Sequence, residues 1–117
     1  VNLFVEKGEE VVSTKGRIKS KSKSYFANKK PLDTDVPIAV LINSASASAS
    51  EIVSGALQDL DRGVVIGQRS YGKGLVQQTK KLSYNTQLKL TIAKYYIFCK
   101  KTTRISCFNC EIFRDKK

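Results

Sequence analysis

IAVLINSASASASEIVSGALQDL, residues 38–60, is the stretch that decides the fold. Its first five residues are all apolar and three of them are β-branched, which is typical of a strand buried on both faces of a parallel sheet. A run of alanine and serine follows, and residues 51–60 then carry apolar side chains at helical spacing. Gly63 comes soon after, where a left-handed glycine would end the helix. The stretch therefore predicts a strand, a small-residue loop and a helix.

The flanking segments extend this unit on both sides. Downstream, residues 64–66 predict another short buried strand, and a glycine-rich turn at 71–74 follows it. Strands are then predicted at 75–79 and 88–92, joined by a turn at 83–86 into a hairpin. Upstream, residues 10–14 predict a short strand, and the Lys/Ser-rich segment 15–30 predicts an exposed edge or loop. The order is that of an α/β fold with an antiparallel addition.

Length and composition narrow the class of protein. The 117 residues allow one domain or a piece of one, and 41% apolar with 26% charged residues is ordinary globular composition. No apolar run approaches the ~18 residues of a membrane-spanning helix. The chain has no methionine, so we expect it to be a processed form or a fragment. It also has no histidine, which excludes Ser-His-Asp and Cys-His catalysis and His-ligated metal within this chain.

The charge and the cysteines favour no specialised role. The net charge of +11 is spread along the whole chain, and no segment combines dense Lys/Arg with stacking aromatics. A small basic nucleic-acid binder is therefore only an alternative interpretation. The three cysteines, Cys99, Cys107 and Cys110, fall short of the four ligands of a structural zinc site. We expect neither a zinc nor a redox role for them.

Ser48 and Glu51 form the Ser-x-x-Glu pattern of a capping box. In the structural interpretation Ser48 only caps the helix, which stabilises it by ~1 kcal/mol. In the functional interpretation Ser48 is a nucleophile at the end of a sheet, and the free N–H groups of the helix N-terminus stabilise an oxyanion. A hydroxyl needs a base to become a nucleophile, and without histidine that base would be a lysine.

Lys73 is the candidate base. It lies between Gly72 and Gly74 with apolar neighbours on both sides, and burial there would favour the neutral amine that a general base needs. In an extended segment Gln77 faces the same side as Lys73, so its amide could hold the amine. The alternative is a solvated lysine in a glycine turn. The sequence has no Walker pattern, so a phosphate-binding loop is not predicted.

Four motifs together resemble the C-terminal processing peptidases, also called tail-specific proteases. These are PIAVLIN at 37–43, SASASE at 46–51, GALQD at 55–59 and YGKGLVQ at 71–77. The resemblance covers residues 1–97. It implies an α/β core with the Clp protease/crotonase-like fold, here incomplete, and serine endopeptidase activity through an acyl-enzyme.

The resemblance also assigns roles to residues. It makes Ser48 the nucleophile, Lys73 the general base, Gln77 the residue that positions this lysine, and the backbone N–H of Ala49 one oxyanion donor. It implies protein or peptide substrates cleaved near their C-termini, no nucleic-acid partner, and neither a metal nor an organic cofactor. Relatives commonly work in the bacterial periplasm or envelope, or in the chloroplast lumen, and the parent protein could be membrane-associated.

The sequence departs from the family pattern in three respects. Ala45 stands where many relatives have glycine. The PDZ domain, the first core strands and the glycine-rich loop implied to supply a second oxyanion donor have no counterpart in the chain. After residue 97 relatives usually continue Pro-Ser-Gly-Arg, whereas residues 98–117 differ. We therefore divide the chain into a partial peptidase core, 1–97, and an atypical tail, 98–117, which we hypothesise to arise from a frameshift.

Missing core strands would have a physical consequence. The strand predicted at 38–42 would keep an unpaired edge and uncovered apolar faces. We therefore expect the isolated chain to be inactive or weakly stable. A catalytically inactive binding or assembly remnant of the same fold is the second interpretation of its function.

Overall fold

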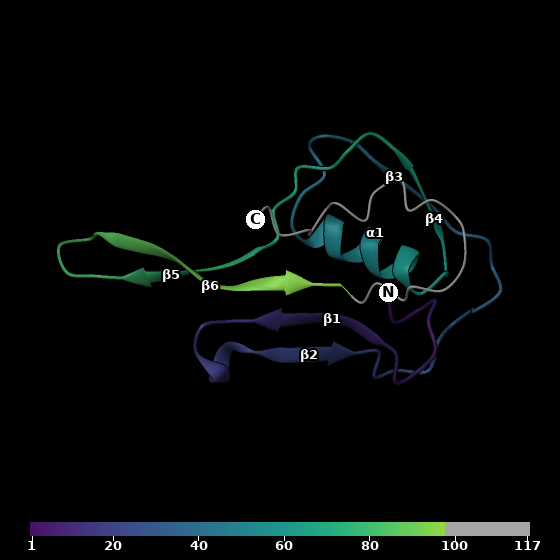
Figure 1. The fold of residues 1–117 in the computed structure, drawn as a ribbon, viewed down its shortest axis with the longest axis horizontal. Coiled ribbons are helices and arrows are strands. Elements are labelled where there is room, and N and C mark those ends of the chain that lie inside the picture. Colours follow the sequence, from purple (N-terminus) through teal and green to yellow (C-terminus); the bar gives the residue numbers. More distant parts are fainter. Residues whose placement is uncertain (98–117) are drawn as a thin grey trace.

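The predicted strand–helix unit forms as β3 (Ala39–Ile42) and α1 (Ala49–Asp59) in the computed structural model, which describes residues 1–97. The chain then enters β4 (Val64–Gly67), which pairs with β3 in parallel. Figure 1 shows α1 beside this two-stranded sheet. The unit is therefore a βαβ crossover, and the loop after β3 leads directly into the N-terminus of α1.

The end of α1 differs from the prediction. The residue with a left-handed backbone is Asp61, with φ 52°, and Gly63 does not have a positive φ. Aspartate is one of the few residues besides glycine that enters this region at modest cost. The amides of Arg62 and Gly63 both donate to the carbonyl of Leu57, at 2.8 and 3.1 Å, and this satisfies the helix end.

A second, antiparallel sheet runs beside the βαβ unit. Its strand order is β2-β1-β6-β5, so β6 lies between β1 and β5. Figure 1 shows the β5–β6 hairpin extending away from α1, beyond the ends of β1 and β2. The short 3-10 helix Lys19–Lys21 connects β1 to β2. The bounds are β1 (Glu10–Lys15), β2 (Lys23–Phe26), β5 (Leu75–Lys81) and β6 (Gln87–Tyr96).

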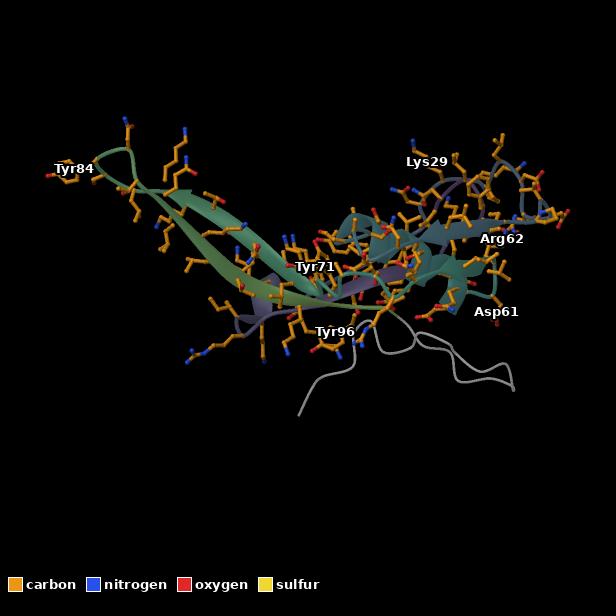
Figure 2. All side chains as sticks on the ribbon, turned by 90° about the horizontal axis from the view of Figure 1, so that it is seen from above. Lys29, Asp61, Arg62, Tyr71, Tyr84 and Tyr96 are labelled. Atoms are coloured by element: carbon orange, nitrogen blue, oxygen red, sulfur yellow. The ribbon has the colours of Figure 1, made fainter. Side chains whose placement is uncertain are left out.

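The tip of the hairpin is a tight turn. Tyr84 and Asn85 have φ values of 58° and 55°, and the Thr86 amide donates to the Ser83 carbonyl at 3.3 Å. Two central residues with positive φ are typical of a type I′ turn, whose twist matches the two flanking strands. Tyr84 is 98% exposed and lies at one extreme of the molecule in Figure 2.

The hydrophobic core is small and lies where α1 meets the N-terminal segment. Its fully buried members are Val5, Ala27 and Leu57. The Arg62 guanidinium supports the same region by donating from Nε to the Phe4 carbonyl at 2.6 Å. Partly buried apolar residues surround this cluster: Val1, Phe4, Val11, Ile38, Val40 and Leu60. A core of this size gives the chain little hydrophobic stabilisation to spare.

One prediction about β3 is wrong for this chain. We expected the strand to be buried on both faces, yet only Ile42 is buried, and Leu41 is 77% exposed. On the paired strand, Val64 and Ile66 are also exposed, and Ile66 lies opposite Leu41. Within residues 1–97 α1 covers one face of the β3–β4 sheet and the other has no second layer.

Asp59, the last residue of α1, gives a test of this packing. Burial, and then the neighbouring Asp61, raises the pKa of Asp59 to about 6. In an unfolded chain the pKa of an aspartate carboxyl is ~3.9, so between about pH 4 and 6 the folded state binds the proton more tightly than the unfolded state. The free energy of unfolding therefore falls as the pH rises from about 4 through 6. We expect Asp59→Asn to raise the free energy of unfolding by about 1 kcal/mol at pH 7.5, because the carboxyl is still partly solvated.

Denaturant melts of both proteins at pH 4.5 and 7.5 measure this difference. The stabilisation should shrink to roughly half or less at pH 4.5, where the folded carboxyl is mostly protonated and the unfolded carboxyl is still mostly charged. Asp35→Asn, at an exposed loop position, is the matched control and should change little at either pH. An equal gain at both pH values would contradict the assignment.

Candidate active site

Ser48 lies at the junction between β3 and α1 with an unusual backbone. Its φ is 56° and its ψ is −110°, a combination that residues with a side chain rarely adopt. The preceding loop is held by short-range bonds, since the Asn43 amide donates to Ser46 Oγ at 3.1 Å and the Ala45 amide to Asn43 Oδ1 at 3.0 Å. Such strain persists only where surrounding contacts fix it, and strained residues of this kind cluster at functional sites.

Ala49 is the first residue of α1 and follows Ser48 directly. The first N–H groups of a helix have no intrahelical acceptor, and the helix dipole makes that end positive. Ala49 is an exposed residue at this end of the helix. The predicted oxyanion donor therefore directly follows the predicted nucleophile in the chain, and its role stays a prediction.

Lys73 lies in the loop between β4 and β5, and its side chain is half-buried. Gly72 has a φ of 84°, which a glycine adopts readily, and this turn precedes the lysine. The Tyr71 amide donates to the Ser46 carbonyl at 2.9 Å. The loop between β4 and β5, residues 68–74 (the lysine loop), is therefore bound to the loop between β3 and α1, residues 43–48 (the serine loop). In Figure 2 Tyr71 lies where the hairpin joins the body of the molecule.

Glu51 connects the two loops. It is completely buried, and Oε2 accepts hydrogen bonds from the backbone amides of Ser48 at 2.7 Å and Lys73 at 3.0 Å. Oε1 accepts from the Gly72 amide at 2.5 Å and from Ser70 Oγ at 2.7 Å. The backbones at positions 48 and 73 are therefore held close together, because both amide nitrogens lie within 3.0 Å of one oxygen atom.

The sequence predicted only part of this arrangement. The half of the capping box in which Glu51 accepts from the Ser48 amide is confirmed. The link to residues 70–73 was missed, because those partners lie 19 to 22 positions away and leave no local pattern. The available signal was an acidic residue in the first turn of a helix with one apolar face, because a carboxylate that becomes buried there needs several donors.

Gln77 is not brought to Lys73 by a direct bond. It lies in β5 opposite Thr91, its side chain is exposed, and within residues 1–97 that side chain forms no hydrogen bond with Lys73. The orienting role of Gln77 stays a prediction. The serine loop and the lysine loop meet through Glu51, whereas Gln77 lies on the exposed hairpin.

Among residues 1–97 no three His, Cys, Asp or Glu side chains gather in a way that could hold a metal ion. The cysteines of the predicted tail, 98–117, lie outside the described residues. In the described part of the chain, α1 is too short and too polar to cross a bilayer.

Comparison with known proteins identifies relatives of this chain. The profile of peptidase family S41 matches residues 1–103. A carboxy-terminal-processing protease of Bartonella bacilliformis is 50% identical over 95 residues, and carboxyl-terminal-processing peptidase 1 of Arabidopsis thaliana chloroplasts is 43% identical over 93 residues. These matches cover 81% and 80% of this chain but only 22% and 19% of the two relatives.

A solved structure agrees with the sequence matches. The photosystem II D1 C-terminal processing protease superposes with a TM-score of 0.71 at 34% identity, over 82% of this chain and 24% of that one. The α/β architecture is therefore part of a larger peptidase core, as the resemblance implied. The chain belongs to peptidase family S41, whose relatives named above are C-terminal processing proteases.

Proposed function

We propose that this chain carries the nucleophile and the general base of a serine endopeptidase that acts near the C-termini of proteins. The observation that supports this best is the strained Ser48, bound by its backbone to the same carboxylate oxygen as the backbone of Lys73. The reaction class is proposed from the relatives, which are named as C-terminal processing proteases. Because this chain matches only 22% and 19% of their lengths, we propose the complete activity for a larger protein that contains it. By the same analogy we propose a periplasmic or envelope location, or the chloroplast lumen.

The proposed chemistry follows from the residue types. The Ser48 hydroxyl attacks the scissile carbonyl carbon while the Lys73 amine, as general base, takes its proton. The developing oxyanion accepts a hydrogen bond from the Ala49 N–H, at the positive end of α1. The C–N bond then breaks, and Lys73 returns the proton to the leaving amine. Water, deprotonated by the same lysine, finally hydrolyses the acyl-enzyme and frees Ser48. Gln77 would orient the lysine once substrate is bound.

Substitution of the dyad tests this proposal. The protein is a chimaera in which residues 1–97 replace the matched 95-residue segment of the Bartonella bacilliformis relative. We expect Ser48→Ala to abolish labelling by a fluorophosphonate probe, and Lys73→Met to lower peptide hydrolysis by about 10³-fold or more, because the hydroxyl loses its base.

Ser44→Ala is the matched control, since Ser44 is an exposed serine of the same loop, and it should leave labelling unchanged. Turnover that survives Ser48→Ala would refute the nucleophile. If the chimaera is active and its Lys73→Met variant hydrolyses peptide at the wild-type rate, the role of Lys73 as general base is refuted. If the unsubstituted chimaera folds but neither labels nor turns over, the binding or assembly remnant becomes the better interpretation.

Glu51 gives a second test. In Glu51→Gln the amide nitrogen replaces one acceptor oxygen, so at least one buried donor faces another donor. We expect the free energy of unfolding to fall by about 1–3 kcal/mol. Acylation at a temperature where the variant is still folded should also slow about tenfold, because the two loops are held less accurately.

The comparison variant is Ser70→Ala, which removes one hydrogen-bond donor to Glu51 but leaves the carboxylate and its hydrogen bonds from three backbone amides. It should keep most of the acylation rate. Steady-state kinetics separate the two roles: kcat should fall in Glu51→Gln while KM stays nearly constant. A variant that is destabilised but acylates at the wild-type rate would reduce Glu51 to a folding role.

A further inference from the structure

The β5–β6 hairpin is the largest feature of the molecule that the proposed chemistry leaves unused. β5 starts at Leu75, two residues after Lys73, and the hairpin carries the chain from the candidate site out to the exposed turn at Tyr84. Residues 77–81 and 87–91 are all exposed. The hairpin is therefore a continuous surface that begins at the candidate site and faces solvent.

The charge on this surface has one sign. Residues 75–97 contain four lysines, Lys80, Lys81, Lys89 and Lys94, and no acidic residue. Lys80 and Lys81 are neighbours on β5, so they point to opposite faces of the hairpin. The register pairs Thr79 with Lys89, which puts Lys89 on the same face as Lys81. Both faces near the tip are therefore cationic.

The backbone of β5 is also available. Within residues 1–97 β5 pairs only with β6 and is an edge strand of the four-stranded sheet. An edge strand presents free N–H and C=O groups, and an extended peptide can pair with them as an added strand. At ~3.3 Å per residue, such a peptide would advance one residue for each residue of β5.

We propose that the outer edge of β5 binds an extended segment of the polypeptide substrate, and that the lysines near the tip select acidic side chains in it, about seven residues from the scissile bond. This inference rests on the proposed peptidase function for the meaning of "substrate". A strand added to β5 has side chains on both faces. Lys80 meets acidic groups on one face, and Lys81 with Lys89 meets them on the other.

Fluorescence anisotropy with the full chain tests the proposal. The probes are labelled twelve-residue peptides of one β-prone sequence in which alternate positions carry glutamate, glutamine or lysine. We expect the glutamate peptide to bind most tightly, and its affinity to fall when salt is raised from 50 to 200 mM. Equal binding of the glutamate and glutamine peptides would overturn the proposal.

A pair of charge-reversed variants locates the site. In Lys80→Glu combined with Lys81→Glu, the glutamate peptide should bind about tenfold more weakly and the lysine peptide more tightly. Lys29→Glu combined with Lys30→Glu changes the net charge equally at the opposite end of the molecule (Figure 2), and should change affinity less than twofold. Equal losses in both variants would mean attraction to the whole chain and would overturn the site. Circular dichroism checks that both variants are folded.

Backbone pairing has its own measurement, which uses the wild-type chain and so does not depend on a variant's folding. N-methyl groups on alternate residues of the glutamate peptide block one of its two hydrogen-bonding edges. We expect one methylated set to lose binding about tenfold and the other to retain it, because an added strand uses alternate N–H groups. Unchanged binding of both sets would overturn strand addition.

Two further measurements distinguish this inference from general polyanion binding and from the proposed peptidase function. The first uses a 20-nucleotide single-stranded DNA. If it binds as tightly as the glutamate peptide, and Lys80→Glu combined with Lys81→Glu (the hairpin variant) abolishes that binding, the surface is a general polyanion site and the proposal is overturned. If Ser48→Ala leaves hydrolysis by the chimaera intact, the proposed function fails while peptide binding on β5 stands. If hydrolysis depends on Ser48 but the hairpin variant binds normally, only this inference fails.

Discussion

A buried carboxylate with four hydrogen-bond donors is the interaction on which the rest of the site depends. Glu51 is removed from water, and such burial is costly unless its oxygens are fully satisfied. Three backbone amides and one hydroxyl satisfy them, from the start of α1 and from the loop before β5. Because charge-assisted hydrogen bonds are strong and directional, this single side chain fixes the relative position of the two loops, which the bond from the Tyr71 amide to the Ser46 carbonyl also joins.

The βαβ unit provides what this interaction needs. Parallel pairing of β3 and β4 brings the ends of both strands to one edge of the sheet, where ligands of α/β folds commonly bind. The serine loop leaves the end of β3, and the lysine loop leaves the end of β4. The backbone strain at Ser48 is sustained by this rigid setting: the helix behind it, the strand before it and the Glu51 bond to its amide all restrict relaxation.

Local patterns in the sequence predicted the local structure well. Short apolar runs predicted β3 and β4, apolar residues at helical spacing predicted α1, and alternation predicted β6. Interactions between distant segments had no such pattern. The partners of Glu51 and the pairing of β6 with β1 depend on contacts across tens of residues. The helix end was assigned to Gly63 because glycine is the commonest left-handed residue, whereas Asp61 takes that conformation. The exposure of Leu41 depends on which layers are present, and composition alone cannot show this.

The open face of the β3–β4 sheet has a consequence for how the chain behaves in solution. Leu41, Val64 and Ile66 offer an apolar surface that another copy could cover, and within residues 1–97 no strand pairs with the edge of β3 away from β4. The net charge of +11 opposes such association, because like-charged copies repel one another. Screening shortens that repulsion to about 8 Å at physiological ionic strength. Colloidal stability of the separate chain therefore declines as electrolyte is added, and dilute buffer of low ionic strength is the medium that keeps it dispersed.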